Sequence, residues 1–203
     1  MARDPLTLPV FLSASIPDPR RDPRYIESAD VTAIRESILA LAVAVLPRGR
    51  LVFGGHPAIS PLILLISTSL NARHRVRVYQ SDFFRAQIPP ESRAFEDLVW
   101  TPSVEGDSAA SLHLMRERML DSGPFHAAFF IGGMEGVESE FSMFRTKWPT
   151  TPVYPVASTG AAASILLENR NQNFPSTFSP QLAQDLRRDF VYGELFDRLL
   201  TLH

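Results

Sequence analysis

Residues 129–140 read Phe129-Phe130-Ile131-Gly132-Gly133-Met134-Glu135-Gly136-Val137-Glu138-Ser139-Glu140, and this stretch decides the fold that we expect. The apolar run predicts a buried strand that turns at a double glycine into a helix whose first turn carries carboxylates. Glycine lets a ligand approach the backbone closely, and the free N–H groups of a helix start attract an anion. The stretch therefore predicts a strand, a turn and a helix, with a ligand site at the turn.

Small residues follow three other apolar runs in the same way. The carboxyl ends of parallel strands meet at one edge of a sheet, so we expect these turns to line a shared cleft. The hydroxyls of Ser13 and Ser15 either shape their turn or face the ligand, and both interpretations stay open. The predicted ligand-binding residues are Ser13, Ser15, Gly54, Gly55, His56, Gly132, Gly133, Met134, Glu135, Gly136, Ser158, Thr159 and Gly160.

Strands and helices alternate along the chain. We expect strands at residues 9–13, 50–53, 75–79, 98–100, 125–131 and 151–156. We expect helices from 28 or 30 to 47, at 62–70 after an N-cap at Ser60, at 107–122, from the double glycine to about 147, at 161–167, and as one terminal helix at 179–200. Residues 16–24, 81–93 and 168–176 read as loops. This order predicts a single Rossmann-like α/β domain over residues 1–203, with a doubly wound, mainly parallel sheet flanked by helices.

The composition narrows the class of protein. The chain has 203 residues, a formal net charge of −2, 45% hydrophobic and 21% charged residues, which describes an ordinary globular domain. We expect no nucleic-acid partner, because a duplex binder usually carries a basic stripe. The first residues lack an apolar signal core and no apolar run reaches membrane length, so we expect a soluble cytoplasmic protein with no membrane partner.

Several chemistries are missing from the sequence. There is no cysteine, which excludes disulfides, zinc thiolate sites and thiol nucleophiles. The five histidines are scattered without the spacing of metal ligands, so we expect no metal and no other cofactor. Neither a P-loop GxxxxGK[ST] nor a nucleophile elbow GxSxG is present. A P-loop nucleotidase and a serine hydrolase are therefore disfavoured.

The order and spacing of these motifs resemble the SLOG superfamily, the Rossmann-like group that includes the lonely-guy cytokinin-activating phosphoribohydrolases. Those enzymes carry PGGxGTxxE after a core strand, and residues 131–140 here read IGGMEGVESE, with one extra residue before Gly136. The family motif resembling M-H-x-R-K corresponds to Met115-Arg116-Glu117-Arg118-Met119, which aligns Arg118 with the family arginine. Val137 replaces the family threonine, Arg116 its histidine and Met119 its lysine.

The resemblance implies a nucleotide-type small molecule as ligand, of the ADP-ribose or NAD kind or a nucleoside phosphate. The departures favour a divergent branch, some members of which resemble sensors of ADP-ribose-type signals in bacterial conflict systems. Relatives commonly dimerise through helices, so we expect a homo-oligomer, with an effector protein as a further partner.

Cleavage of the ligand is the alternative to binding it. Breaking an N-glycosidic bond passes through a ribose with oxocarbenium character, which a carboxylate stabilises. In an N-ribosyl hydrolase or transferase, the resemblance makes Glu140 and Arg118 the catalytic residues. Simpler roles are also open, because Glu140 suits a helix start and Arg118 suits a surface ion pair. Three hypotheses follow: a ligand-binding module, a hydrolase or transferase, and a structural partner protein with a vestigial cleft.

Overall fold

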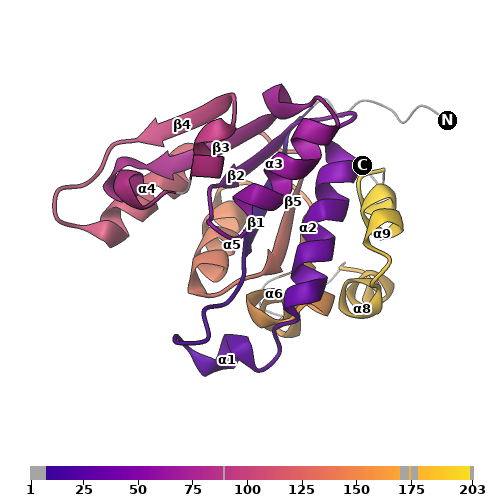
Figure 1. Cartoon of the computed structure of the whole chain (residues 1–203). Helices are drawn as coiled ribbons and strands as arrows, with labels where there is room; N and C mark the ends of the chain where they lie inside the picture. Colours follow the sequence, from indigo (N-terminus) through magenta and orange to yellow (C-terminus); the bar gives the residue numbers. More distant parts are fainter. Residues whose placement is uncertain (1–7, 89, 170–173, 175–177, 202–203) are drawn as a thin grey trace.

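The computed structural model describes residues 8–88, 90–169, 174 and 178–201. Their strands form one parallel sheet in the order β4-β3-β2-β1-β5-β6 (Figure 1). The strands are β1 (Val10–Ser15), β2 (Leu51–Gly54), β3 (Val76–Ser81), β4 (Asp97–Thr101), β5 (Ala127–Gly132) and β6 (Val153–Val156). The chain runs outward from β1 to β4 and returns on the other side through β5 and β6. This confirms the predicted doubly wound α/β fold and places its switch point between β1 and β5.

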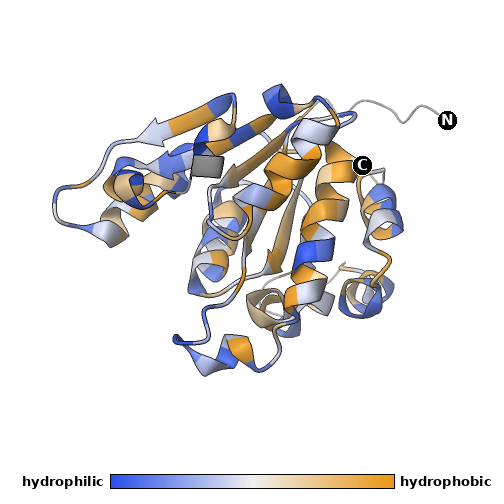
Figure 2. Ribbon diagram, in the orientation of Figure 1, coloured by the Kyte–Doolittle hydropathy of each residue, from blue (hydrophilic) through white to orange (hydrophobic). Residues whose placement is uncertain are grey.

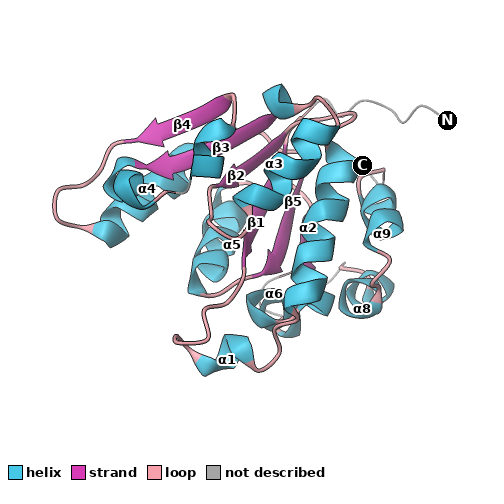
Figure 3. Ribbon diagram, in the orientation of Figure 1, coloured by secondary structure: helices cyan, strands magenta, loops and turns pink. Residues whose placement is uncertain are grey.

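Helices cover both faces of the sheet (Figures 1 and 3). One face packs against α2 (Val31–Val45), α3 (Ser60–Ser69), α8 (Pro180–Arg188) and α9 (Tyr192–Leu199). The other packs against α4 (Ser108–Leu120), α5 (Glu135–Lys147) and most of α6 (Ala161–Glu168). Alternate residues of β5 enter the two cores, since Phe129 lies in the first and Phe130 in the second. Figure 2 accordingly colours β5 and much of α2 and α3 as hydrophobic.

Side-chain caps fix where several helices begin. Asp30 accepts a hydrogen bond from the backbone N–H of Ala33 at the start of α2, and Asp107 accepts one from Ala110 at the start of α4. The expected cap at Ser60 is wrong, because Ser60 is the first residue of α3. Its hydroxyl instead accepts from the backbone N–H of His56 at 3.1 Å, which closes the turn after β2.

The single terminal helix that the apolar periodicity predicts is also wrong. The helix is interrupted between α8 and α9, where the carboxylate of Asp189 accepts a hydrogen bond from the backbone N–H of Val191 at 2.9 Å. Aspartate forms such local bonds in competition with the helix. Phe190, which fits the apolar periodicity of the predicted helix, is 57% exposed.

The connection between β1 and α2, which we call the arm (residues 16–30), is more ordered than a loop. It holds Pro17, Pro19 and Pro23, and its second half forms the short helix α1 (Pro23–Ile26). Asp22 caps α1 by accepting from the backbone N–H of Arg24. In Figure 1 the arm lies below the carboxyl ends of β1 and β5, at the same edge of the sheet as the switch point.

Short 3-10 helices occupy other connections: η1 (Arg73–Arg75), η2 (Asp82–Gln87), η3 (Pro90–Ala94) and η4 (Ala157–Thr159). Most of the loop expected at 168–176 lies outside the described residues. In the described part of the chain, no helix combines the length and the apolar character that crossing a bilayer requires. The same residues contain no group of three or more histidines and carboxylates arranged to hold a metal ion.

Candidate functional site

The predicted glycine turns meet at the carboxyl edge of the three central strands. Ser15, the last residue of β1, pairs with Gly132, the last residue of β5. The carbonyl of Ser15 then accepts a hydrogen bond from the N–H of Gly133 at 2.8 Å. On the other side of β1, the pairing of Leu12 with Phe53 places Gly54 beside Ser13. The turns after β2, β1 and β5 are therefore neighbours, as the sequence predicts.

The turn that starts α5, residues 132–136, needs glycine for steric reasons and is called the α5 turn below. Gly132 and Gly133 have φ angles of +55° and +87°. A Cβ atom on Gly132 would lie 2.5 Å from Ile34 Cδ1, and one on Gly133 would lie 2.2 Å from Val137 Cγ2. Side chains at both positions are thus excluded by backbone conformation and by packing.

The α5 turn leaves three backbone donors open. The N–H groups of Met134, Glu135 and Gly136 find no acceptor among the described residues, and Met134 provides no side-chain cap. The first helical bond runs from Val137 N to Met134 O at 2.9 Å. Unpaired amides at the start of a 13-residue helix form a favourable position for an anion.

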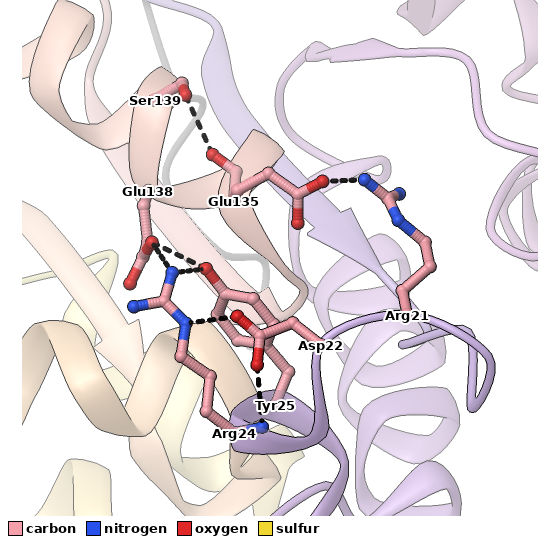
Figure 4. Close-up of polar contacts among 7 residues, drawn as sticks. All are labelled: Arg21, Asp22, Arg24, Tyr25, Glu135, Glu138 and Ser139. Atoms are coloured by element: carbon pink, nitrogen blue, oxygen red, sulfur yellow. Dashed lines mark hydrogen bonds and ion pairs between the residues drawn. The ribbon is translucent and has the colours of Figure 1, made fainter.

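The arm brings two arginines to the same helix turn (Figure 4). The Arg21 guanidinium forms an ion pair with Glu135, and Arg24 Nη2 lies 3.0 Å from Glu138 Oε2. The Tyr25 hydroxyl donates to Glu138 Oε2 at 2.7 Å, while its ring is fully buried. Burial, and then the bond to Glu138, raise the pKa of Tyr25 to about 12, so the phenol stays protonated at neutral pH.

Glu140 lies deeper between α4 and α5, where its Oε1 is 3.2 Å from Arg116 Nε. Both side chains are largely buried, with exposed fractions of 13% and 17%. Burial raises the pKa of Glu140, and the Arg116 charge and the facing Ser13 hydroxyl offset part of that rise. Gly136 makes room for this pair, because a Cβ there would lie 3.1 Å from Arg116 Nη2.

The structure brings Arg116, rather than Arg118, to the predicted catalytic carboxylate. Arg118 is exposed and forms no ion pair with any described residue. The sequence held a signal for this difference, because Leu112 and Leu120 of α4 both pack in the second core. Position 116 lies one helical turn from each of them, whereas position 118 lies one turn from Leu114 and Ser122, which are not part of that core. A role of Arg118 in binding or catalysis stays a prediction.

The turn that starts α6, residues 158–161, is filled by the chain itself and is called the α6 turn below. Thr159 Oγ1 accepts from Gly132 N at 2.8 Å and donates to Val156 O. Ser28 of the arm accepts from Ala161 N at 2.9 Å, and a Cβ on Gly160 would lie 1.7 Å from the Ser28 carbonyl oxygen. The predicted ligand contacts in this turn, Ser158, Thr159 and Gly160, are all buried in internal contacts.

His56 packs into the turn after β2. Its Nδ1 accepts from the backbone N–H of Ala58 at 3.2 Å, so the neutral ring carries its proton on Nε2. Burial lowers the pKa of His56, which keeps the ring neutral at pH 7. Gly55 is needed here as well, because a Cβ would lie 1.9 Å from Gln80 Nε2.

Comparison with known protein families identifies the family of the chain. A family model described as the SLOG cluster3 family matches residues 24–200, which include the α5 turn, Arg116 and Glu140. No curated protein and no solved structure matches the chain significantly.

Proposed function

The chain belongs to the SLOG cluster3 family, and from that premise we propose that it binds a nucleotide-derived ligand at the switch point between β1 and β5. The ligand is a phosphate-bearing molecule of the ADP-ribose or NAD type or a nucleoside phosphate. Membership of the family supports a nucleotide-related binding or ribosyl-processing role.

The observation that carries the proposal is the set of three unpaired amides at Met134, Glu135 and Gly136. They lie where ligands bind in open α/β sheets, outside the carboxyl ends of the strands at the switch point. A phosphate bound there would accept hydrogen bonds from the amides and gain from the helix dipole. Ser13 on β1 and Glu140 on α5 face each other near the same edge of the sheet.

Binding without cleavage is the favoured form of this function. Arg116 contacts Glu140 Oε1, and its positive charge lowers the basicity of that carboxylate. Val137, whose side chain is buried, stands where the lonely-guy enzymes carry a threonine. A sensor that holds its ligand intact needs neither group, and a sensory role with an effector partner is part of the proposal.

One substitution pair tests the amides directly. Proline is tolerated at the first position of a helix, so Glu135→Pro removes one N–H while keeping α5. Glu135→Ala removes the same carboxylate and keeps the N–H, which makes it the matched control. By isothermal titration with ADP-ribose, cyclic ADP-ribose, NAD and AMP, we expect wild type to bind at least one ligand. Glu135→Pro should bind it about tenfold more weakly than Glu135→Ala, the effect of one charge-assisted hydrogen bond.

Silence from all four ligands with folded protein would contradict the proposed function. Equal affinities of Glu135→Pro and Glu135→Ala would show that the Glu135 amide does not bind the ligand.

A hydrolase or transferase is the second candidate, because the raised pKa of Glu140 suits a general acid or base. Incubation with NAD and nucleoside monophosphates, followed by chromatography, tests this activity. Base release that is faster in wild type than in Glu140→Gln would support cleavage, and equal background rates would end this candidate.

The expected homo-oligomer also stays a prediction. Leu65 on α3 and Val43 on α2 are 59% and 46% exposed, which gives these helices apolar outer positions. Sedimentation velocity of the purified chain measures the number of subunits directly.

A further inference from the structure

The first turn of α5 carries negative charge beside the open amides. Glu135 is the first residue of the helix and Glu138 follows one turn later. A phosphate bound at the amides would face both carboxylates, and like charges at such short range repel strongly. The proposed site therefore needs a source of positive charge that α5 itself does not provide.

The arm provides that charge, as Figure 4 shows. Arg21 approaches Glu135 and Arg24 approaches Glu138, so each carboxylate of the turn has one guanidinium beside it. The arginine side chains are 55% and 53% exposed, which leaves them accessible to a ligand. Within the described residues, Arg21 uses only Nη2. Arg24 uses Nε for Asp22 and Nη2 for Glu138 and the Tyr25 hydroxyl, and its Nη1 makes no bond. Donors suited to phosphate oxygens thus remain on both side chains.

These arginines are not needed to hold the arm in place. Tyr25 anchors the arm with a fully buried ring. The N–H of Asp30 donates to Thr159 O at 3.2 Å, and Ser28 accepts from Ala161 N at 2.9 Å. Exposed ion pairs contribute little to stability. The arm thus keeps its position through burial and backbone bonds, and its two exposed arginines are free to serve another purpose.

We infer that Arg21 and Arg24 are ligand-binding residues, which neutralise Glu135 and Glu138 and bind the phosphates of the ligand at the α5 turn. This inference rests on the proposed function and deepens it. The two arginines lie beside carboxylates one helical turn apart, so they offer two cationic positions rather than one. The site accordingly favours a ligand with two linked phosphates, such as ADP-ribose, over a monophosphate such as AMP.

Titration calorimetry of single variants tests the inference. Arg21→Ala should weaken ADP-ribose binding at least tenfold, because Glu135 then faces the phosphate without a counter-charge. Arg24→Ala should weaken it several-fold. Arg20→Ala is the matched control, since Arg20 lies on the same arm, is 87% exposed and pairs with Asp18 instead. It should change the affinity by less than twofold.

Two further variants separate charge from structure. In the double variant Arg21→Ala/Glu135→Gln, most of the lost affinity should return, because the unpaired carboxylate is gone. Arg21→Lys should bind with intermediate affinity, since the charge remains but the planar fork is lost. All variants should melt within a few degrees of wild type.

The outcomes distinguish this inference from the proposed function. Equal ADP-ribose affinities of Arg21→Ala and Arg20→Ala would overturn the inference while leaving the function intact. No recovery in the double variant would overturn the role in neutralising Glu135. An AMP affinity equal to that of ADP-ribose in wild type would overturn the preference for two phosphates. Failure of wild type to bind either ligand would instead sink the proposed function.

Discussion

The α5 turn and the α6 turn follow neighbouring strands, yet they treat the amides of their helices in opposite ways. At the α5 turn, the N–H groups of Met134, Glu135 and Gly136 meet no acceptor in the described part of the chain. At the α6 turn, Ala161 N donates to Ser28 Oγ and Ala162 N donates to Gly133 O. The first amides of α5 are unpaired in the described part of the chain, whereas those of α6 are bonded to the arm and to the α5 turn.

The difference comes from the arm rather than from either turn. The arm sends a hydroxyl into the α6 turn and guanidinium groups toward the α5 turn. Small residues at the end of a strand therefore identify a turn whose backbone another group can approach closely. They do not identify the group that approaches the turn. That group is determined by the arm, which lies more than 100 residues earlier in the chain.

The largest effect is expected from adding a side chain to the filled α6 turn. Gly160→Ala places a Cβ against the Ser28 carbonyl oxygen at a φ of +70° and should cost about 4 kcal/mol of unfolding free energy. Gly106→Ala is the control, because Gly106 has the same φ of +70° but open space around it. It should cost about 1 kcal/mol from backbone strain alone. Equal losses in urea denaturation would show that the arm does not pack on this turn.

The second largest effect is expected at the ion pair between Arg116 and Glu140. Arg116→Met leaves the Glu140 carboxylate buried without its partner and should cost about 2 kcal/mol, less than the loss for fully buried pairs. The exposed Arg118→Met should change stability by less than about 0.5 kcal/mol.

This effect has a pH dependence of known sign. Because the folded pKa of Glu140 is raised, its protonated form is favoured in the fold, and stability falls as pH rises through that pKa. The deficit of Arg116→Met should therefore shrink as pH is lowered. Equal stabilities of the two methionine variants would contradict the assignment of Arg116.

A smaller effect is expected from removing the Ser28 hydroxyl from the α6 turn. Ser28→Ala removes the acceptor for Ala161 N and should cost about 1 kcal/mol, as the loss of a helix cap does. Ser69→Ala removes an exposed hydroxyl that bonds within α3 and should cost less than about 0.5 kcal/mol. Ligand stoichiometry should stay at one, because Ala162 N keeps its bond to Gly133 O. A second bound ligand would mean that Ser28 alone separates the two turns.

The smallest effect extends the comparison to the turn after β2. Burial lowers the folded pKa of His56 below its ordinary value of 6.5, so its stabilisation is complete above pH 6.5 and is lost as pH falls through the folded pKa. The melting temperature of wild type should therefore decrease slightly below pH 6.5. His56→Asn keeps an acceptor for Ala58 N without a titrating ring, and it should lack that part of the decrease. Parallel pH profiles would rule His56 out as the cause.

The alternation of apolar runs and amphipathic segments was sufficient to predict the strands, most helices and the parallel sheet. The double glycine was sufficient to predict the α5 turn, because glycine itself permits the positive φ angles that this turn requires. Arg116 could have been found from its position one helical turn from both Leu112 and Leu120, which pack in the second core. The contacts of the arm could not, since Tyr25 and Glu138 are 113 residues apart and neither carries a local signal of the other. The interruption between α8 and α9 could not be predicted from the sequence, because Phe190 and Val191 fit the helical periodicity although both are exposed to solvent.

The prolines of the arm have a consequence for the kinetics of recognition. Pro17, Pro19 and Pro23 restrict a segment that contains no glycine, so its backbone has few alternative conformations to give up. A flexible flap would lose entropy on capturing a ligand, whereas this segment has lost it already when the domain folds. Association should then resemble docking onto a rigid surface, with a rate limited by diffusional encounter rather than by closure of a flap.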